Sequence, residues 1–187
     1  NQEDVSMLIR FFRASLLAAA VCCFAAMPAL AGGKAKPAKS LSSADKDFLN
    51  RAVLECMAEV DLGKLAAQHG SSPEVKQLGQ KMADDHSKAE DDLKKLAVDK
   101  NFELPTFLGP AGQIDRMELK KLTGDKFDRE YVEDTLKDHK KDLSTFEREA
   151  DKGKDPDVKA LASKMLPALK QHLDLAEQAE AKVDKGS

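Results

Sequence analysis

The chain has 187 residues, with 30 Lys or Arg and 33 Asp or Glu, so its formal net charge at pH 7 is −3. Charged residues of both signs make up 34% of the chain, and it contains no Trp and one Tyr. Nucleic-acid binding needs a basic surface of one sign with aromatic stacking positions. The composition therefore speaks against a nucleic-acid partner, and the length suits one domain with a real core.

The first 31 residues have the pattern of a secretory signal. Met7 begins it, Arg10 and Arg13 form a positive region, residues 16–24 are apolar, and Ala29-Leu30-Ala31 is a small-x-small cleavage site. We expect cleavage after Ala31, with residues 1–6 lying upstream of the true start. The expected location is the periplasm of a Gram-negative bacterium, with association to the outer membrane left open.

Residues 32–41 are rich in Lys, Ala and Pro and predict a flexible linker. Residues 42–184 then form one domain. Cleavage would remove Cys22 and Cys23 and leave Cys56 as the single thiol, so we expect no internal disulfide. No later stretch has the length and apolarity of a membrane helix, so no transmembrane span is expected in the mature chain.

Four long helices are predicted from the spacing of apolar residues and from start and stop signals. The first runs from Ser42 or Ser43 to about His69, and the second from Pro73 to about Asn101. The third runs from Asp125 to about Lys152, and the fourth begins after Asp155-Pro156, with a kink expected at its internal Pro167. The connection between the first two is short enough to make them an antiparallel hairpin.

The segment 102–123 separates the two pairs of helices. It is interrupted by Pro and Gly residues, and only a short helical piece is predicted, at 114–122. Two helical hairpins joined by a long crossover is the chain order of ferritin-like bundles. The predicted fold is therefore an all-α, ferritin-like four-helix bundle whose crossover joins the second and third long helices.

Four polar residues interrupt the apolar stripes, one on each long helix, and they are Glu59, His86, His139 and His172. A buried polar group without a partner costs about 1–3 kcal/mol, and more when it is charged. Imidazole and carboxylate are ligands for transition metals, so a metal ion in the bundle core would offset this cost. We predict a metal site formed by these four residues.

Counting residues from the helix ends tests whether the four lie at one level. Glu59 is 11 residues before Gly70 and His86 is 13 after Pro73, so these two can face each other. His139 is 13 residues before Lys152 and His172 is 16 after Pro156, an offset of roughly one helical turn. Glu59 with His86 is thus the better-aligned pair by this count.

The type of metal follows from the ligands. Ferritin-like di-iron proteins carry Glu-x-x-His on two helices, whereas Ala83, Leu136 and Leu169 stand three residues before the histidines. A carboxylate-bridged di-iron oxidase is therefore disfavoured, and a His-rich mononuclear site for Zn, Cu or Fe fits better. The alternative is that each His is a core residue satisfied by a neighbour, such as Asp142 beside His139.

Other candidates are weaker. Cys56 lies one turn from Glu59 as a ligand or redox thiol, although a lone Cys on an apolar stripe is more often core. Met82 and Met165 share the stripes of His86 and His172 and would suit copper, yet Met is a routine gap-filler.

Several motifs together resemble the domain of unknown function 4142. They are Glu59-Val60 with Leu62-Gly63-Lys64-Leu65-Ala66, residues 82–86, Gly124-Asp125-Lys126-Phe127-Asp128 with Tyr131, Asp138-His139, and Leu166-Pro167 with His172-Leu173. The resemblance spans about residues 42–183. It implies an exported bacterial protein with a ferritin-like four-helix fold, often labelled as an outer-membrane or periplasmic protein, and it supplies no established reaction.

The sequence thus favours a protein that binds a transition metal for metal handling or for stress tolerance of the cell envelope. A metal-free structural or interaction module of the envelope is the main alternative, and a homodimer is left open for either. A metal-dependent oxidoreductase is the third reading, with Asp85, Asp138 and Asp142 as guesses for an acid or base. The sequence identifies no catalytic residue and leans away from an enzyme.

Overall fold

The structure, a computed structural model, describes residues 40–184. These residues belong to one compact unit, Pro37–Ser187, while a second unit, Asn1–Lys36, lies outside the described residues. The expected secretory signal and nearly all of the expected linker therefore fall outside them as well.

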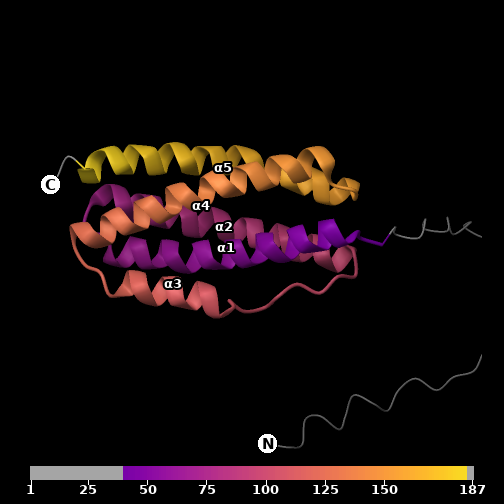
Figure 1. Cartoon of the computed structure of the whole chain (residues 1–187), viewed down its shortest axis with the longest axis horizontal. Coiled ribbons are helices and arrows are strands. Elements are labelled where there is room, and N and C mark those ends of the chain that lie inside the picture. Colours follow the sequence, from indigo (N-terminus) through magenta and orange to yellow (C-terminus); the bar gives the residue numbers. More distant parts are fainter. Residues whose placement is uncertain (1–39, 185–187) are drawn as a thin grey trace, which may run out of the picture. The chain divides into compact units, whose positions relative to one another are not determined.

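Every regular element in residues 40–184 is helical, which confirms the all-α prediction (Figure 1). The helices are α1 (Ser43–His69), α2 (Pro73–Asp99), α3 (Pro110–Lys120), α4 (Asp125–Lys152) and α5 (Pro156–Val183). α1 packs mainly against α2, and α4 mainly against α5, while α2 with α5 and α1 with α4 hold the two pairs together. Within each pair the chain reverses direction (Figure 1).

Side chains and proline start these helices where the sequence predicts. Ser42 and Asp45 form a capping box at α1, in which each side chain bonds the backbone amide of the other. Ser72 caps α2 ahead of Pro73, and Asp155 caps α5 ahead of Pro156. Proline lacks an amide proton, but at the first helical position this proton would have no partner within the helix. The cap and the proline together therefore define where α2 and α5 begin after each hairpin turn.

The crossover differs in detail from the prediction. α3 begins at Pro110 and ends at Lys120, whereas the sequence predicted helix at 114–122. Gly109 followed by Pro110 is itself a start signal, and the apolar spacing alone did not reveal it. α2 ends two residues early because Asn101 adopts a positive φ of 51°. α5 continues as helix through Pro167.

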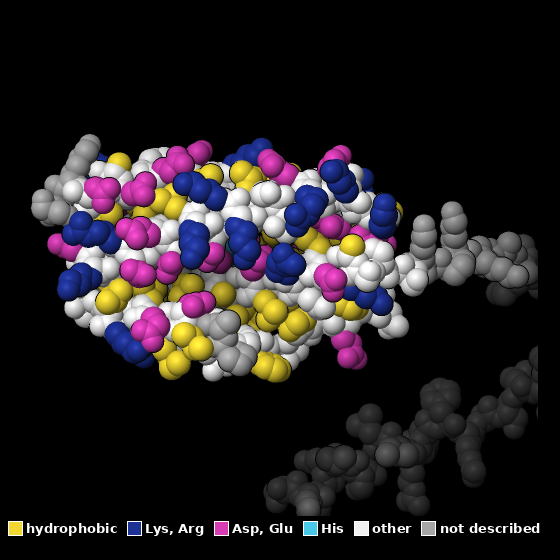
Figure 2. Space-filling view, in the orientation of Figure 1, with side chains coloured by type: hydrophobic (Ala, Val, Ile, Leu, Met, Phe, Trp, Pro, Cys, Tyr) yellow, Lys and Arg dark blue, Asp and Glu magenta, His cyan; other side chains and the backbone are white. Residues whose placement is uncertain are grey.

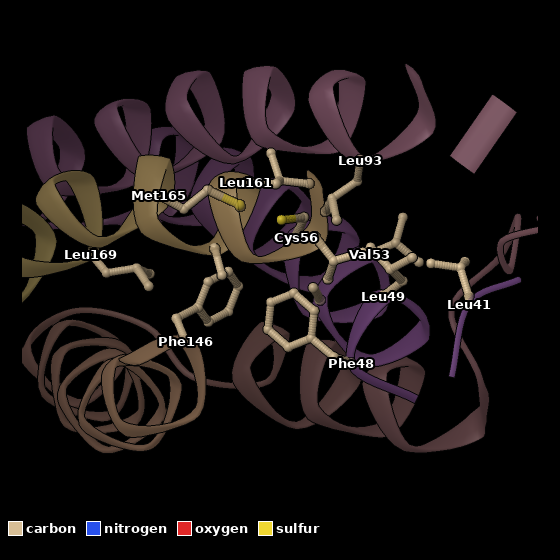
Figure 3. Close-up of a cluster of buried hydrophobic side chains, with 13 residues drawn as sticks. Leu41, Phe48, Leu49, Val53, Cys56, Leu93, Phe146, Leu161, Met165 and Leu169 are labelled. Atoms are coloured by element: carbon tan, nitrogen blue, oxygen red, sulfur yellow. The ribbon is translucent and has the colours of Figure 1, made fainter. Parts of the chain in front are cut away.

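Hydrophobic side chains form two clusters, one toward each end of the long helices. One cluster joins the start of α1, the end of α2 and the start of α5, and Figure 3 shows Cys56 among its members with Val53 and Leu93. The other joins the end of α1 with the starts of α2 and α4, around Phe127 and Tyr131. Polar residues at the middle of the helices separate the two clusters.

A buried carboxylate closes each end of the bundle. Asp128 on α4 accepts hydrogen bonds from the backbone amides of Ser71 and Ser72, at 2.8 and 2.7 Å, in the α1–α2 turn. At the other end Asp45 accepts bonds from the amides of Lys154 and Asp155 in the α4–α5 turn. These bonds to a charged acceptor tie each hairpin turn to the opposite helix pair.

The surface carries acidic and basic side chains interspersed over the face seen in Figure 2, with hydrophobic side chains along its lower edge. The large exposed hydrophobic residues include Phe107, Ile114 and Met117, in and beside α3. In residues 40–184 no helix combines the length and apolarity that crossing a bilayer requires.

Candidate metal centre

Three helices bring one histidine each to the middle of the bundle. His86 comes from α2, His139 from α4 and His172 from α5, and all three are buried, with His139 at 0% exposure. Each occupies the inward face that the apolar spacing predicted. They lie between the two hydrophobic clusters.

His139 is the central member of this group. Its Nε2 lies 3.4 Å from Nε2 of His86 and 3.2 Å from Nδ1 of His172. One ligand atom from each histidine lies within 4.8 Å of the other two. We call these residues the histidine trio. Such a spacing allows three nitrogens to point at a single ion.

The trio includes the pair that residue counting gave as less well aligned, His139 with His172. The side chains close the offset of roughly one turn, because Cα–Cβ bonds tilt toward the N-terminus of their helix. α4 and α5 run in opposite directions, so the tilt moves His139 away from the α4–α5 turn and His172 toward it. His139 is nearer this turn in sequence, and the two rings therefore meet.

Hydrogen bonds outside the trio fix the tautomers of two of its rings. Nδ1 of His139 lies 3.1 Å from the carbonyl oxygen of Thr135, one turn earlier, and must donate to it. Nε2 of His172 lies 3.1 Å from a carboxylate oxygen of Asp85 on α2 and must donate there. A neutral imidazole has one proton, so Nε2 of His139 and Nδ1 of His172 are left with lone pairs.

The protein environment keeps the trio neutral. Burial, together with the nearby His172, lowers the pKa of His139 to about 4. Burial also lowers the pKa of His172, and burial with the two neighbouring rings places the pKa of His86 well below its usual value. Neutral imidazole is the form that binds metals. The trio is therefore in its ligating form at neutral pH.

Asp85 remains charged beside the trio. Burial acts to raise its pKa, but hydrogen bonds from Lys81 and His172 outweigh burial and bring it to about 2. A carboxylate that accepts from the far nitrogen of a histidine is the usual second partner of a metal-bound imidazole, which it orients and makes more basic. The sequence alone suggests Asp85 only as an acid or base, and this role as a partner of His172 is not evident from it.

His86 has one nitrogen without a partner. Its Nδ1 is buried and makes no hydrogen bond within the described residues. If Nε2 carries the proton, it can donate to His139, and Nδ1 is then a bare acceptor. If Nδ1 carries the proton, three lone pairs converge at the centre of the trio. Either state leaves buried polar groups unsatisfied in the metal-free protein, at about 1–3 kcal/mol each.

Glu59, the fourth predicted ligand, lies on the other side of the His139 ring. Its Oε1 is 3.9 Å from Nδ1 of His139, the nitrogen that faces Thr135, and Glu59 is not one of the residues whose ligand atoms converge. Burial, followed by the charges of Asp138 and Asp142, raises the pKa of Glu59 to about 8. The structure thus brings together the three histidines and sets Glu59 about one ring away.

Glu59 faces a cavity of about 450 Å³ between α1, α4 and the crossover, which sequence analysis did not foresee. Glu55 and Asp142 also line it. Burial, followed by the charge of Asp142, raises the pKa of Glu55 to about 8, and burial, followed by the charge of Asp138, raises that of Asp142 to about 6. Asp142, expected beside His139, therefore neighbours Glu55 instead. Asp142 on α4 and the two glutamates on α1 belong to different helices, so the sequence carried no local signal that they lie close together.

The other candidates lie in the core. Cys56 is 2% exposed, belongs to the first hydrophobic cluster, and burial raises the pKa of its thiol. Met82 is fully buried in the second cluster. Met165 lies in the first cluster and also faces a cavity beside His86 and His172. Core packing accounts for Cys56 and Met82.

Comparison with known proteins gives a family and a fold. The model of a family described as "Domain of unknown function (DUF4142)" matches residues 31–179. No curated protein matches the chain. A solved structure, described as the crystal structure of a DUF305 fragment from Deinococcus radiodurans, superposes with a TM-score of 0.68 at 10% identity. The match covers 77% of this chain and 99% of that one, and it speaks for the fold alone.

Proposed function

Because the chain belongs to the DUF4142 family, whose description assigns no activity, we propose its function from the site itself: the bundle binds one transition-metal ion through His86, His139 and His172. The observation that carries this proposal is the 3.2 Å approach of Nε2 of His139 to Nδ1 of His172. Both nitrogens present lone pairs, because the other nitrogen of each ring donates to an oxygen. Two facing lone pairs repel, and a cation between them converts the repulsion into two bonds.

The donor set favours Zn, Cu or Fe, as the sequence predicts. Neutral imidazole suits these ions, whereas Mg²⁺ and Ca²⁺ prefer oxygen ligands. The hydrogen bonds of His139 to Thr135 and of His172 to Asp85 are second partners of the kind that metal-bound histidines have. Glu59 in this proposal supplies a carboxyl group behind His139 rather than a ligand atom.

The proposal places the site in a ferritin-like four-helix bundle without the di-iron ligands of that class. The four long helices, the two hairpins and the helical crossover support this arrangement. A single ion held by three histidines suits metal handling, or stress tolerance in the cell envelope, better than iron mineralisation. Export would place the protein in the cell envelope, where it would encounter the metal ions present there.

Export rests on residues 1–31, which lie outside the described residues. The family match begins at Ala31, the last residue before the expected cleavage. Expression with these residues in a Gram-negative host, followed by intact-mass analysis of the periplasmic fraction, tests this part. A mature chain beginning at Gly32 supports export, and a chain that keeps residues 1–31 and stays in the cytoplasm contradicts it.

The metal proposal is tested by titrating purified, untagged protein with Zn²⁺ and comparing two variants. We expect one ion per chain for the natural protein and for His69→Ala, which removes the described histidine outside the trio. We expect at least a 100-fold loss of affinity for His139→Ala. Equal binding by the two variants would overturn the proposal, as would absence of binding by the natural protein.

Thermal unfolding adds a second readout. A ligand present at 100 times its dissociation constant stabilises the folded state by about 2.7 kcal/mol. For a domain of this size that corresponds to a rise in Tm of about 5–10 °C. A chelator should reverse the rise in the natural protein and should leave His139→Ala unchanged.

A further inference from the structure

One side of the histidine trio opens toward a cavity of about 200 Å³ between α2 and α5. His86 and His172 form part of its wall, whereas His139 is fully buried and does not line it. The trio therefore has a closed side, at His139, and an open side, at the other two rings. The remaining wall includes Ala89 from α2 and Ala168 from α5.

Among the His, Cys, Asp and Glu side chains of residues 40–184, three bring their ligand atoms together at the trio and no fourth does. Zn²⁺ in proteins is almost always four-coordinate, and a site with three protein ligands keeps one position for water or another exogenous ligand. Glu59 lies beyond the far nitrogen of His139, so it cannot fill this position without a change of rotamer and of ring contacts. The free position would face the cavity, because the cavity borders the two outer rings.

The size of the cavity restricts what can enter it. A water molecule takes about 30 Å³ of liquid volume, so 200 Å³ corresponds to roughly seven waters. Pockets for drug-sized ligands begin at about 300 Å³. A ligand of a few non-hydrogen atoms can be enclosed in this volume, whereas a nucleotide or a sugar chain is too large for it.

The charges around the cavity select the sign of the ligand. Lys164 is paired with Asp92 at 2.6 Å, and Asp85 is paired with Lys88 at 3.3 Å, so the charged residues of the wall compensate one another. Three neutral imidazoles leave the full charge of a divalent ion uncompensated. An anion in the cavity beside that ion is attracted to it, and the attraction is stronger than in bulk water because the protein lowers the local dielectric constant.

We propose that the cavity between α2 and α5 is the ligand chamber of the metal site and admits one small monodentate anion as the fourth ligand of the bound ion. This inference rests on the proposed metal binding and adds that the site is open to exchange. An open position distinguishes a site that acts on a ligand from a closed structural site.

The test uses Co²⁺, whose visible spectrum reports its ligands, and azide as the probe. Protein loaded with one equivalent of Co²⁺ is titrated with azide and the absorption bands are followed. We expect a saturable change that fits one azide per ion. A Co²⁺-loaded protein whose spectrum does not respond to azide would refute the chamber while leaving the metal proposal intact. A protein that takes up no Co²⁺ would refute both.

Two variants locate the azide. Ala168→Leu and Ala89→Leu fill the cavity from opposite walls, and leucine is favourable in a helix. Each should keep one equivalent of Co²⁺ and weaken azide binding at least 10-fold. Ala58→Leu, which fills the acidic cavity on the opposite side of the bundle, is the control and should leave azide affinity unchanged. Azide affinity that is unchanged in both cavity-filling variants with bound Co²⁺, or reduced equally in the control, would overturn the proposal.

Discussion

His139 Nε2 and His172 Nδ1 lie 3.2 Å apart, and both are acceptors, because the single N–H of each ring donates elsewhere, to the carbonyl oxygen of Thr135 and to the carboxylate of Asp85. The proposed metal binding depends on this relationship. Without a cation, the two lone pairs repel each other, which costs free energy. A metal ion can bind between them without rearrangement of the two rings.

Removal of the second partner of His172 should weaken metal binding without removing a ligand. Asp85→Ala deletes the carboxylate 3.1 Å from Nε2 of His172, and loss of such a partner typically costs 10–100-fold in metal affinity. The chain offers a matched control in Asp138→Ala, which sits directly before His139 as Asp85 sits before His86, but is exposed. Competition titration with a chromophoric chelator should give a 10–100-fold loss for the first variant and about twofold or less for the second.

The metal-free protein should tolerate an apolar residue at the centre of the trio. His139→Leu removes the facing lone pairs and keeps the volume, and apolar replacement of a strained polar group is often neutral or stabilising. Urea unfolding in the presence of chelator should give a free energy of unfolding equal to the natural value or about 1 kcal/mol higher. A loss of more than about 2 kcal/mol would favour the alternative of a metal-free structural network.

The carboxylate of Asp128 should be important for stability. Its two bonds to the amides of Ser71 and Ser72 have a charged acceptor and are worth about 1.5–3 kcal/mol each in favourable cases. Asp128→Ala should lower the free energy of unfolding by about 3 kcal/mol. Asp125→Ala, in the same turn of α4 but exposed, should change it by about 0.5 kcal/mol or less. Similar effects of the two changes would show that the tie across the bundle end contributes little.

The contact between α1 and α2 requires glycine. A Cβ at Gly63 would lie 2.6 Å from the carbonyl oxygen of Gly79, so the helices would have to separate. Gly63→Ala should destabilise the fold by about 1–3 kcal/mol despite the better helix propensity of Ala. At Gly109 an added Cβ meets nothing within 4 Å, and Gly109→Ala should be nearly neutral. Chemical denaturation of both variants measures the two changes in the free energy of unfolding, and equal changes would contradict the requirement for glycine at position 63.

Glu149 should make stability depend on pH. Burial, and then its contact with Asp45, raises the pKa of Glu149 to about 7, above the value of 4.5 expected in the unfolded chain. Between these values the folded state binds more protons than the unfolded state, so this group contributes less stability as pH rises from 4.5 to 7. Glu149→Gln should therefore raise the free energy of unfolding at pH 8 by about 1 kcal/mol and leave it nearly unchanged at pH 4. A variant that is less stable at pH 8 would contradict the assignment.

Much of the fold follows from local signals in the sequence. Caps, prolines and apolar spacing predict the long helices, because each of these acts within a few residues. The predicted start of α3 was wrong by four residues, since the helix begins at a signal formed by Gly109 and Pro110 and not at the first residue of the apolar spacing. The inward placement of the three histidines also follows from periodicity, and their burial confirms it.

The contacts of the site required the structure. Asp85 and His172 are 87 residues apart and lie on different helices, and no periodicity predicts which carboxylate reaches which ring. The displacement of Glu59 from the trio has the same origin, because the rotation of α1 about its axis is set by packing along the whole helix. Tautomers follow only when every hydrogen-bond partner is known.

The central claim is that the nitrogens of His86, His139 and His172 bind one ion, and X-ray absorption spectroscopy of Zn²⁺-loaded protein counts those nitrogens directly. The account predicts three imidazole nitrogens at about 2.0–2.1 Å, a fourth light-atom ligand and no sulfur. A first shell of oxygen ligands without imidazole, or a sulfur at about 2.3 Å, would contradict it.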